Sequence, residues 1–179
     1  MKTIYFVRHG ESEANRLGLS AGSEFDTPLT DKGRQQARKT GQELKHKNIE
    51  LIIASPLGRT VETAQIIANE IGYDAKTIVT SPLFIERGMG IYSKGPDEDY
   101  LKAATSGDPL HESVEPAQQM HERISEGLKW LESFKEKNIL IVSHGGVSRI
   151  LRLMHKDLPH SHMYKIERLP NAAIYEFTM

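Results

Sequence analysis

The sequence contains no cysteine, which excludes disulfides and metal sites built on thiolates. Long apolar runs are missing as well. The N-terminal stretch MKTIYFVRHGE closes its short apolar run with charged residues, unlike a signal peptide, and no later stretch reaches the length of a membrane span. We therefore expect a cytoplasmic protein with no membrane partner.

An excess of charge of either sign is also missing. The formal net charge is −1 and the isoelectric point is about 6.7, so the protein has no global positive field that would attract nucleic acid. We expect no nucleic-acid partner, and any anion that the protein binds must be held by a local cluster of cations.

The composition is that of an ordinary globular protein. Of its 179 residues, 38% are hydrophobic and 26% are charged. A chain of this length can bury one substantial core but is short for two, so we expect residues 1–179 to form a single domain.

Apolar strand-like runs alternate with amphipathic helical patterns along the chain. The runs are rich in Ile, Val, Tyr and Phe and occupy residues 3–7, 51–54, 77–80, 139–143 and 173–177. Helical patterns occupy residues 29–45, 58–72, 113–135 and 146–154, with Thr30 as N-cap of the first and Gly72 at the end of the second. Strand followed by helix, repeated, predicts parallel pairing with right-handed crossovers, and hence an α/β fold: a three-layer α/β/α sandwich with a mostly parallel central sheet.

Residues 81–112 interrupt this alternation. They contain three prolines and four glycines, which predicts a loop with one short helix near residues 97–104. A loop of this length in a compact domain is often a lid or a binding surface. Its apolar residues would either cap a substrate or pack the loop onto the domain.

Charged and polar groups follow three of the predicted strands. Arg8 and His9 follow the first, Arg59 lies in the first turn of the helix after the second, and His144 and Gly145 begin the helix after the fourth. Ligands of parallel α/β sheets bind beyond the carboxyl ends of the strands, and the two helix N-termini add backbone N–H donors. These strand ends therefore predict one shared pocket for a multiply charged oxyanion such as phosphate.

The same residues resemble the histidine phosphatase superfamily, also called phosphoglycerate mutase-like. The resemblance rests on FVRHGESEAN, DTPLTDKGRQQA, SPLGRTVETAQIIA, ERGMG, HES and ILIVSHGGVSRILR, which follow the family's order and spacing over nearly the whole chain. It implies the phosphoglycerate mutase-like fold and phosphatase activity on phosphate monoesters. It also implies roles for six residues: His9 as nucleophile, Arg8, Arg59, His144 and Asn15 as ligands of the phosphoryl group, and Glu86 as proton donor.

The residue types suit these implied roles. A neutral imidazole is a competent nucleophile near neutral pH, and neighbouring guanidiniums disfavour its protonated form. Arginine can bind two phosphoryl oxygens at once, and the leaving alkoxide needs a carboxylic acid as its proton source. The residues alone do not choose among Glu11, Glu13 and Glu86 for that acid, and only the resemblance selects Glu86.

The sequence departs from the family pattern at the rim of the expected pocket. Ala14 stands where relatives often carry an aromatic residue, and Ala21 where they often carry Gln or Thr. Lys94 and Gly95 replace the usual pair of an acidic residue and a glycine. Lys94 is therefore a candidate for an additional contact with a phosphate or a carboxylate.

Two motifs of other hydrolases are present in weak form. GLSAG at residues 18–22 satisfies G-x-S-x-G with Ser20 as nucleophile, but the strand and helix that this motif needs are not predicted around it. His155, His160 and His162 are close in sequence, but no acidic ligand pattern accompanies them, and we expect solvated surface histidines. We therefore expect neither a metal ion nor another cofactor.

Hydrolysis of a small phosphorylated substrate, or of a phosphorylated side chain, is the function that we expect. The first alternative is a phosphoglycerate mutase-type phosphomutase, which must shield its phosphohistidine from water and whose members generally carry longer insertions. The second alternative is a non-catalytic regulator that binds phosphorylated ligands. That alternative requires a broken catalytic set, whereas every core position is intact here.

Overall fold

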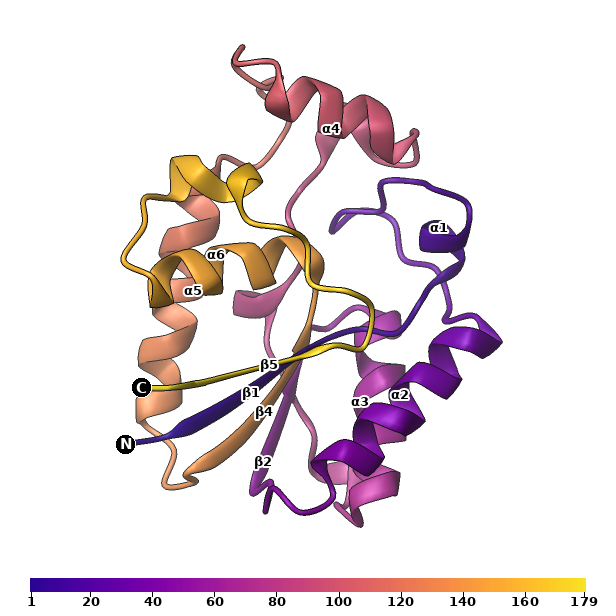
Figure 1. Ribbon diagram of the computed structural model, residues 1–179, viewed down its shortest axis with the longest axis vertical. Helices are drawn as coiled ribbons and strands as arrows, with labels where there is room; N and C mark the ends of the chain where they lie inside the picture. Colours follow the sequence, from indigo (N-terminus) through magenta and orange to yellow (C-terminus); the bar gives the residue numbers. More distant parts are fainter.

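A five-stranded sheet with the order β3-β2-β4-β1-β5 forms the centre of the computed structural model, which describes residues 1–179 (Figure 1). Four strands are parallel to one another, and the last is antiparallel to its neighbour β1. The mostly parallel sheet that the sequence predicts is therefore confirmed. The strands are β1 (Thr3–Arg8), β2 (Leu51–Ala54), β3 (Val79–Thr80), β4 (Asn138–Ser143) and β5 (Ile174–Thr178).

Helices cover both faces of the sheet, as expected for a three-layer sandwich. In Figure 1, α2 and α3 lie on one side of the sheet and α5 and α6 on the other, while α1 and α4 lie beyond the upper end of the strands. The helices are α1 (Glu13–Arg16), α2 (Asp31–Leu44), α3 (Gly58–Ile71), α4 (Asp97–Thr105), α5 (Ala117–Glu132) and α6 (Gly145–His155).

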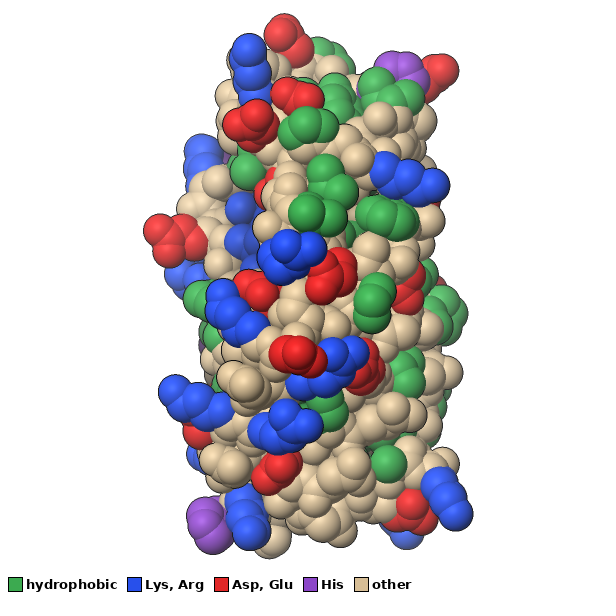
Figure 2. Space-filling view, turned by 90° about the vertical axis from the view of Figure 1, so that its right-hand side faces the viewer, with side chains coloured by type: hydrophobic (Ala, Val, Ile, Leu, Met, Phe, Trp, Pro, Cys, Tyr) green, Lys and Arg blue, Asp and Glu red, His purple; other side chains and the backbone are tan.

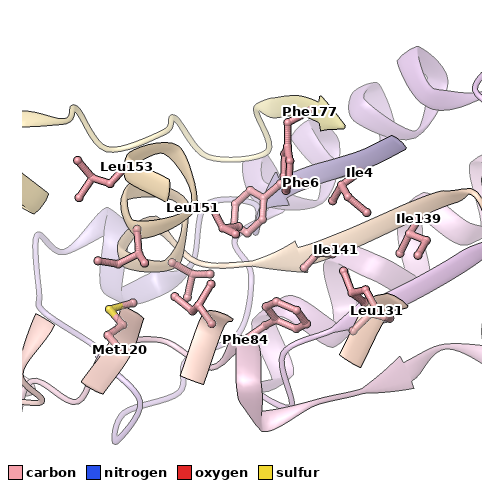
Figure 3. Close-up of a cluster of buried hydrophobic side chains, with 14 of the residues drawn as sticks. Ile4, Phe6, Phe84, Met120, Leu131, Ile139, Ile141, Leu151, Leu153 and Phe177 are labelled. Atoms are coloured by element: carbon pink, nitrogen blue, oxygen red, sulfur yellow. The ribbon is translucent and has the colours of Figure 1, made fainter. Parts of the chain in front are cut away.

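The side chains of neighbouring residues in β1 pack into two different hydrophobic clusters. Ile4 and Phe6 of β1 belong to a cluster of 17 buried residues that includes side chains of α5 and α6 (Figure 3). Tyr5 and Val7 belong to a second cluster, of 10 buried residues, that includes side chains of α2 and α3. Successive side chains of a strand point to opposite faces, so a strand that is covered on both sides must be apolar throughout. Each of these buried side chains stabilises the fold by about 1.5–3 kcal/mol.

The register of the sheet brings the ends of three strands together. β1 and β4 pair so that Arg8 lies opposite Ser143, and β2 and β4 pair so that Ala54 lies opposite Val142. The residues that follow these strands therefore meet at one edge of the sheet.

Two helix boundaries follow the capping signals in the sequence. Thr30 precedes α2, and its hydroxyl accepts a hydrogen bond from the Gly33 amide at 3.0 Å. Gly72 ends α3 in the left-handed conformation, with φ of 74°. Both predicted caps are confirmed.

The helix that was predicted over residues 113–135 is shorter in the structure. It runs from Ala117 to Glu132, because Pro116 at its N-cap has an extended backbone, with φ of −59° and ψ of 141°, and disfavours a helical residue before it. Val114 still packs inward, but in a small cluster with Met89 and Tyr100. The apolar periodicity of residues 113–135 thus extends beyond the helix itself, into the short segments before and after it.

The segment 81–112 contains the short helix that the sequence predicts there. α4 covers Asp97–Thr105, and 3₁₀ turns occupy Pro82–Phe84 and Gly90–Tyr92. Several apolar residues of the segment pack it onto the domain, and the guanidinium of Arg87 binds the hydroxyl groups of Tyr100 and Tyr164. The β-strand before it, expected over 77–80, is reduced to Val79–Thr80 by a 3₁₀ turn at Ala75–Thr77.

Charges of both signs are interspersed over the face that Figure 2 shows, and apolar side chains gather on its upper part, at the height of α1 and α4. No helix in the molecule combines the length and the apolar character needed to cross a membrane.

Candidate active site

The carboxyl ends of β1, β2 and β4 border a cavity of about 380 Å³, including its opening to solvent. Only three of its 13 lining residues are hydrophobic, so it suits a charged ligand together with water. Six of the eight residues singled out from the sequence line it: Arg8, His9, Asn15, Arg59, Glu86 and Gly145. The ring of His144 lies beside that of His9, with 5.3 Å between the centroids.

His9 is buried, and its hydrogen bonds fix which nitrogen can react. Nδ1 lies 2.7 Å from the carbonyl oxygen of Gly10. A carbonyl only accepts, so Nδ1 carries the proton and donates it. Burial, followed by the charges of Arg59 and Arg8, lowers the pKa of His9 well below its usual value. At neutral pH the ring is therefore neutral, and Nε2 keeps a free lone pair.

Arg8 ends β1 and is nearly buried, with 7% of its surface exposed. Its Nη1 donates to the Leu169 carbonyl at 2.8 Å, whereas its buried Nε has no protein acceptor. Burial, followed by the charge of Arg168, lowers the pKa of Arg8 to about 10, so the side chain is still a cation at neutral pH. An oxyanion in the cavity would supply the acceptor that Nε lacks.

Arg59 lies in the first turn of α3 and also organises one wall of the cavity. Its Nη1 forms an ion pair with Asp26 at 2.8 Å and also donates to the Phe25 carbonyl, while Nη2 donates to the Gly22 carbonyl at 2.8 Å. These bonds hold the loop that follows α1 against the start of α3. One guanidinium therefore positions the loop and contributes positive charge to the cavity.

His144 is completely buried, and its partner is Ser55, the residue that follows β2. Nε2 of His144 lies 2.7 Å from the Ser55 hydroxyl, while Nδ1 has no partner. Burial, followed by the charge of Arg59, lowers the pKa of His144 well below its usual value, so the ring is neutral. When Ser55 donates to Nε2, the ring proton sits on Nδ1 and is free to bind an anion.

Asn15 is oriented by two donors. Its Oδ1 accepts from the Ser12 amide at 3.2 Å and from Nδ2 of Asn171 at 3.0 Å. The carbonyl end of the amide is thus occupied, and the NH₂ end is left available to the cavity that Asn15 lines. Asn171 was not predicted, because its role depends on a contact across 156 positions of the chain.

Glu86 is held at the N-terminus of α6. Its Oε1 accepts from the Arg87 amide at 2.8 Å, and its Oε2 accepts from the Gly146 amide at 3.1 Å. A Cβ atom at position 146 would lie 2.3 Å from Oε1 of Glu86, so the glycine leaves room for the carboxyl group in this position. The carboxyl group is therefore fixed at the cavity wall.

Lys94 lies outside the cavity lining. Its ammonium is 5.5 Å from the centre of the Phe25 ring, which is a cation–π contact, and its backbone has a positive φ of 69°. The structure thus does not bring Lys94 together with the other predicted ligands.

Three polar residues of the lining were not predicted as ligands: Ser20, Asp97 and Arg168. The Ser20 hydroxyl donates to Asp97 at 3.0 Å, and Asp97 forms an ion pair with Arg168 at 3.1 Å. The three come from the loop after α1, the start of α4 and the segment before β5, and no sequence motif marks them as a group. Ser20 is not on a turn between a strand and a helix, so it does not have the geometry of a nucleophile elbow.

The histidines near the C-terminus do not form a metal site. His155 at the end of α6 contacts Tyr175, whereas the ring of His160 faces His121 at 5.9 Å. No group of three or more His, Asp or Glu side chains in the molecule is arranged to hold a metal ion.

The fold and the cavity together define a class of protein: an α/β sandwich with a cavity at its sheet edge that is lined by a buried histidine, arginines and a carboxyl group. Residues 4–179 match the family described as the histidine phosphatase superfamily, branch 1, and the chain belongs to that superfamily.

Curated relatives and solved structures agree with this assignment. The chain is 34% identical to "Fructose-2,6-bisphosphatase TIGAR B" of Danio rerio, over 79% of this chain and 56% of that protein. The chain thus spans little more than half the length of that relative. It is 34% identical to "Probable phosphoglycerate mutase GpmB" of Erwinia tasmaniensis, over 97% of this chain and 83% of that protein. The structure of "Bacillus stearothermophilus YhfR" is similar with a TM-score of 0.85 and 25% identity, over 98% of this chain and 90% of that one.

Proposed function

We propose that the protein is a metal-independent phosphatase that hydrolyses phosphate monoesters through a phosphohistidine on His9. The observation that carries the proposal is the state of His9: its Nδ1–H donates to Gly10, its pKa is lowered, and it lines a cavity together with two buried arginines. A neutral imidazole whose Nε2 lone pair is free is a nucleophile at neutral pH.

In the first step, Nε2 of His9 attacks phosphorus, a nitrogen–phosphorus bond forms, and the bond between phosphorus and the ester oxygen breaks. Arg8 and Arg59 bind the phosphoryl oxygens and offset the charge that develops on them. Glu86, in its protonated form, gives its proton to the departing alkoxide.

In the second step, water attacks the phosphohistidine. Glu86, now a carboxylate, accepts a proton from that water, the nitrogen–phosphorus bond breaks, and inorganic phosphate and neutral His9 are regenerated. The polar lining of the cavity supports this step, because water must reach the phosphorus.

Neutral donors complete the proposed phosphoryl site. The NH₂ group of Asn15, the Nδ1–H of His144 and the start of α6 at Gly145 can each donate to an oxygen. Lys94 remains a candidate only for a substrate contact outside this cavity.

A small phosphorylated molecule, or a phosphorylated side chain, is the proposed substrate class. The Danio rerio relative is named for a sugar bisphosphate and the Erwinia relative for a phosphoglycerate, so small phosphate esters of both kinds belong in a substrate panel. We propose that residues 81–112 form the substrate loop, because Met89 and Asp97 of this segment line the cavity.

A phosphomutase is the second candidate, and one observation favours it. The relative named as a phosphoglycerate mutase aligns with 97% of this chain. Both activities begin with the same phosphohistidine, and they differ in whether water or a second alcohol receives the phosphoryl group.

Release of inorganic phosphate from a panel of phosphate monoesters tests the proposal. The assay contains a metal chelator, the panel includes 3-phosphoglycerate and its bisphosphate, and His9→Ala is run in parallel. We expect release by the wild-type protein and a loss on the order of 10³-fold or more in the variant, with an unchanged circular dichroism spectrum. A variant of the exposed His46, His46→Ala, serves as the matched control and should keep full activity.

The other outcomes separate the alternatives. Exchange of phosphoryl groups between phosphoglycerates without net release would identify a mutase. Binding of phosphate esters without release or exchange would identify a phospho-ligand binding protein, and full activity of His9→Ala would contradict the mechanism.

A further inference from the structure

A third guanidinium lines the cavity, and the proposed mechanism does not use it. Arg168 belongs to the segment before β5 and lines the cavity together with Arg8, His9 and Arg59. Its side chain is 27% exposed, so the guanidinium is mostly enclosed by protein but still accessible from the cavity.

Contacts of both the aliphatic stem and the guanidinium fix the position of the Arg168 side chain. Its aliphatic stem packs on Gly145, where a Cβ atom would lie 2.8 Å from Cγ of Arg168. Its Nη1 and Nη2 donate to the two carboxylate oxygens of Asp97, at 3.1 and 3.3 Å. Enclosed stems and two-point ion pairs restrict an arginine to one geometry.

Most of the hydrogen-bonding capacity of Arg168 is still free. A guanidinium has five N–H donors, and Arg168 directs only two of them at a protein acceptor, Asp97. Arg59, in contrast, has three protein acceptors. Three donors of Arg168 therefore have no protein acceptor, and four of Arg8 have none, because Arg8 donates only to the Leu169 carbonyl.

The charge of Arg168 also reaches the residues of the proposed phosphoryl site. It is the second cause, after burial, of the lowered pKa of Arg8, and it contributes to the lowered pKa of His9. Three guanidiniums thus act on one small volume, whereas the carboxylates that line it are Glu86 and Asp97.

We propose that Arg168 binds the phosphoryl group of the substrate as a third guanidinium, and that Asp97 is the residue that positions it. This inference rests on the proposed function. Asp97 is suited to positioning because its own carboxylate is fixed: Oδ1 accepts from the Ser20 hydroxyl, and its amide donates to the Gly18 carbonyl at 2.8 Å. The ion pair between Asp97 and Arg168 therefore joins α4 to the cavity wall at the start of α6.

The affinity of the protein for inorganic phosphate tests the role of Arg168 without requiring turnover. We expect Arg168→Gln to weaken phosphate binding by about tenfold or more, since a hydrogen bond from a charged donor is lost. Arg168→Lys should recover only part of the affinity, because lysine keeps the charge but not the planar fork.

Arg152→Gln is the matched control. Arg152 donates to the Glu167 carbonyl and so supports the same segment of chain, but it does not line the cavity. Its removal should leave phosphate affinity unchanged. Wild-type affinity in Arg168→Gln, or an equal loss in Arg152→Gln, would overturn the inference.

A double-mutant cycle tests the positioning role of Asp97. If Asp97 orients Arg168, the effect of Arg168→Gln on phosphate affinity should be several-fold smaller in an Asp97→Asn background than in the wild type. Equal effects in the two backgrounds would contradict that role. A wild-type protein that binds phosphate but releases none from any ester would contradict the proposed phosphatase activity alone, so the two failures can be told apart.

Discussion

At the scale of single residues, the chemistry depends on which protons each buried side chain carries. The proposed mechanism needs a neutral His9 with its proton on Nδ1. Burial and the charges of Arg59 and Arg8 lower the pKa of His9, and the Gly10 carbonyl accepts the Nδ1 proton. Burial and the charge of Arg59 lower the pKa of His144, and its Nδ1 proton is free when Ser55 donates to Nε2. The site therefore places a neutral imidazole inside a cationic pocket, which is the combination that the proposed attack on a phosphate dianion requires.

The role of Glu86 can be tested with leaving groups of different acidity. Glu86→Gln keeps the shape of the side chain but cannot supply a proton, so hydrolysis of alkyl phosphates should fall by about 10²–10⁴-fold. An activated aryl phosphate, whose leaving group needs little protonation, should be affected much less. The measurement is kcat for both substrate types in the variant and the wild type. Equal slowing of the two would mean that Glu86 is not the leaving-group acid.

Individual residues differ in how far the sequence could predict them. Arg8, His9 and His144 directly follow strands and Arg59 begins the next helix, so the rule that ligands bind beyond strand ends was sufficient to group them. Glu86 was selected only by resemblance, because nothing local distinguishes it from other glutamates. The sequence could not predict Arg168 and Asn171, because their partners are distant in the chain and meet only in the folded protein.

At the scale of elements, the start of α6 holds Glu86, the proposed proton donor, in place. The first turn of this helix carries the Gly146 amide, which donates to Glu86, and Gly145, on which Arg168 packs. The strand before it delivers His144. One helix terminus thus sets the positions of three side chains, and a small displacement there should affect chemistry more than stability.

Gly146→Ala tests this dependence. The added methyl group would lie 2.3 Å from Oε1 of Glu86, so the carboxyl group must move. A displacement on the order of 1 Å can reduce turnover by about 10²-fold, and we expect this loss in kcat with little change in the affinity for inorganic phosphate.

Gly41→Ala is the control for that variant. Its methyl group would lie 2.6 Å from Cβ of Glu70, between α2 and α3 and away from the cavity. It should lower the melting temperature but leave kcat unchanged. Wild-type kcat in Gly146→Ala would show that the position of Glu86 does not limit the reaction.

The sequence predicted the types of the helices and strands better than it predicted their boundaries. The apolar strands, the capped α2 and the end of α3 followed from local signals. The beginning of α5 did not, because Val114 continues the apolar period of the helix while packing into a different cluster, and Pro116 separates the two. The short β3 likewise begins at Val79 rather than at residue 77, because a 3₁₀ turn at Ala75–Thr77 precedes it.

At the scale of the whole molecule, the same burial that prepares the site reduces stability in acid. His9 and His144 have lowered pKa values in the folded protein, whereas in the unfolded chain each titrates near pH 6.5. Below that pH the unfolded state binds more protons than the folded state, so the free energy of unfolding must fall as the pH decreases.

Urea unfolding between pH 7.5 and 5.5 measures this effect. If two histidines stay neutral in the folded state, the free energy of unfolding should fall below pH 6.5 with a slope approaching about 2.7 kcal/mol per pH unit. His9→Asn should reduce the slope by about half, and the exposed-site control His46→Asn should leave it unchanged. A stability that is independent of pH in this range would mean that the buried histidines are not held neutral.

The most direct test of the central claim is to trap the phosphoryl group on the protein. The enzyme is mixed with a radiolabelled phosphate ester that it hydrolyses, quenched in alkali, and the label is mapped. We predict a label that is stable in alkali and lost in acid, as a phosphohistidine is, located on His9 and missing from His9→Ala. An acid-stable label on another residue, such as Ser20, or hydrolysis without any labelled protein under rapid quenching, would contradict the mechanism.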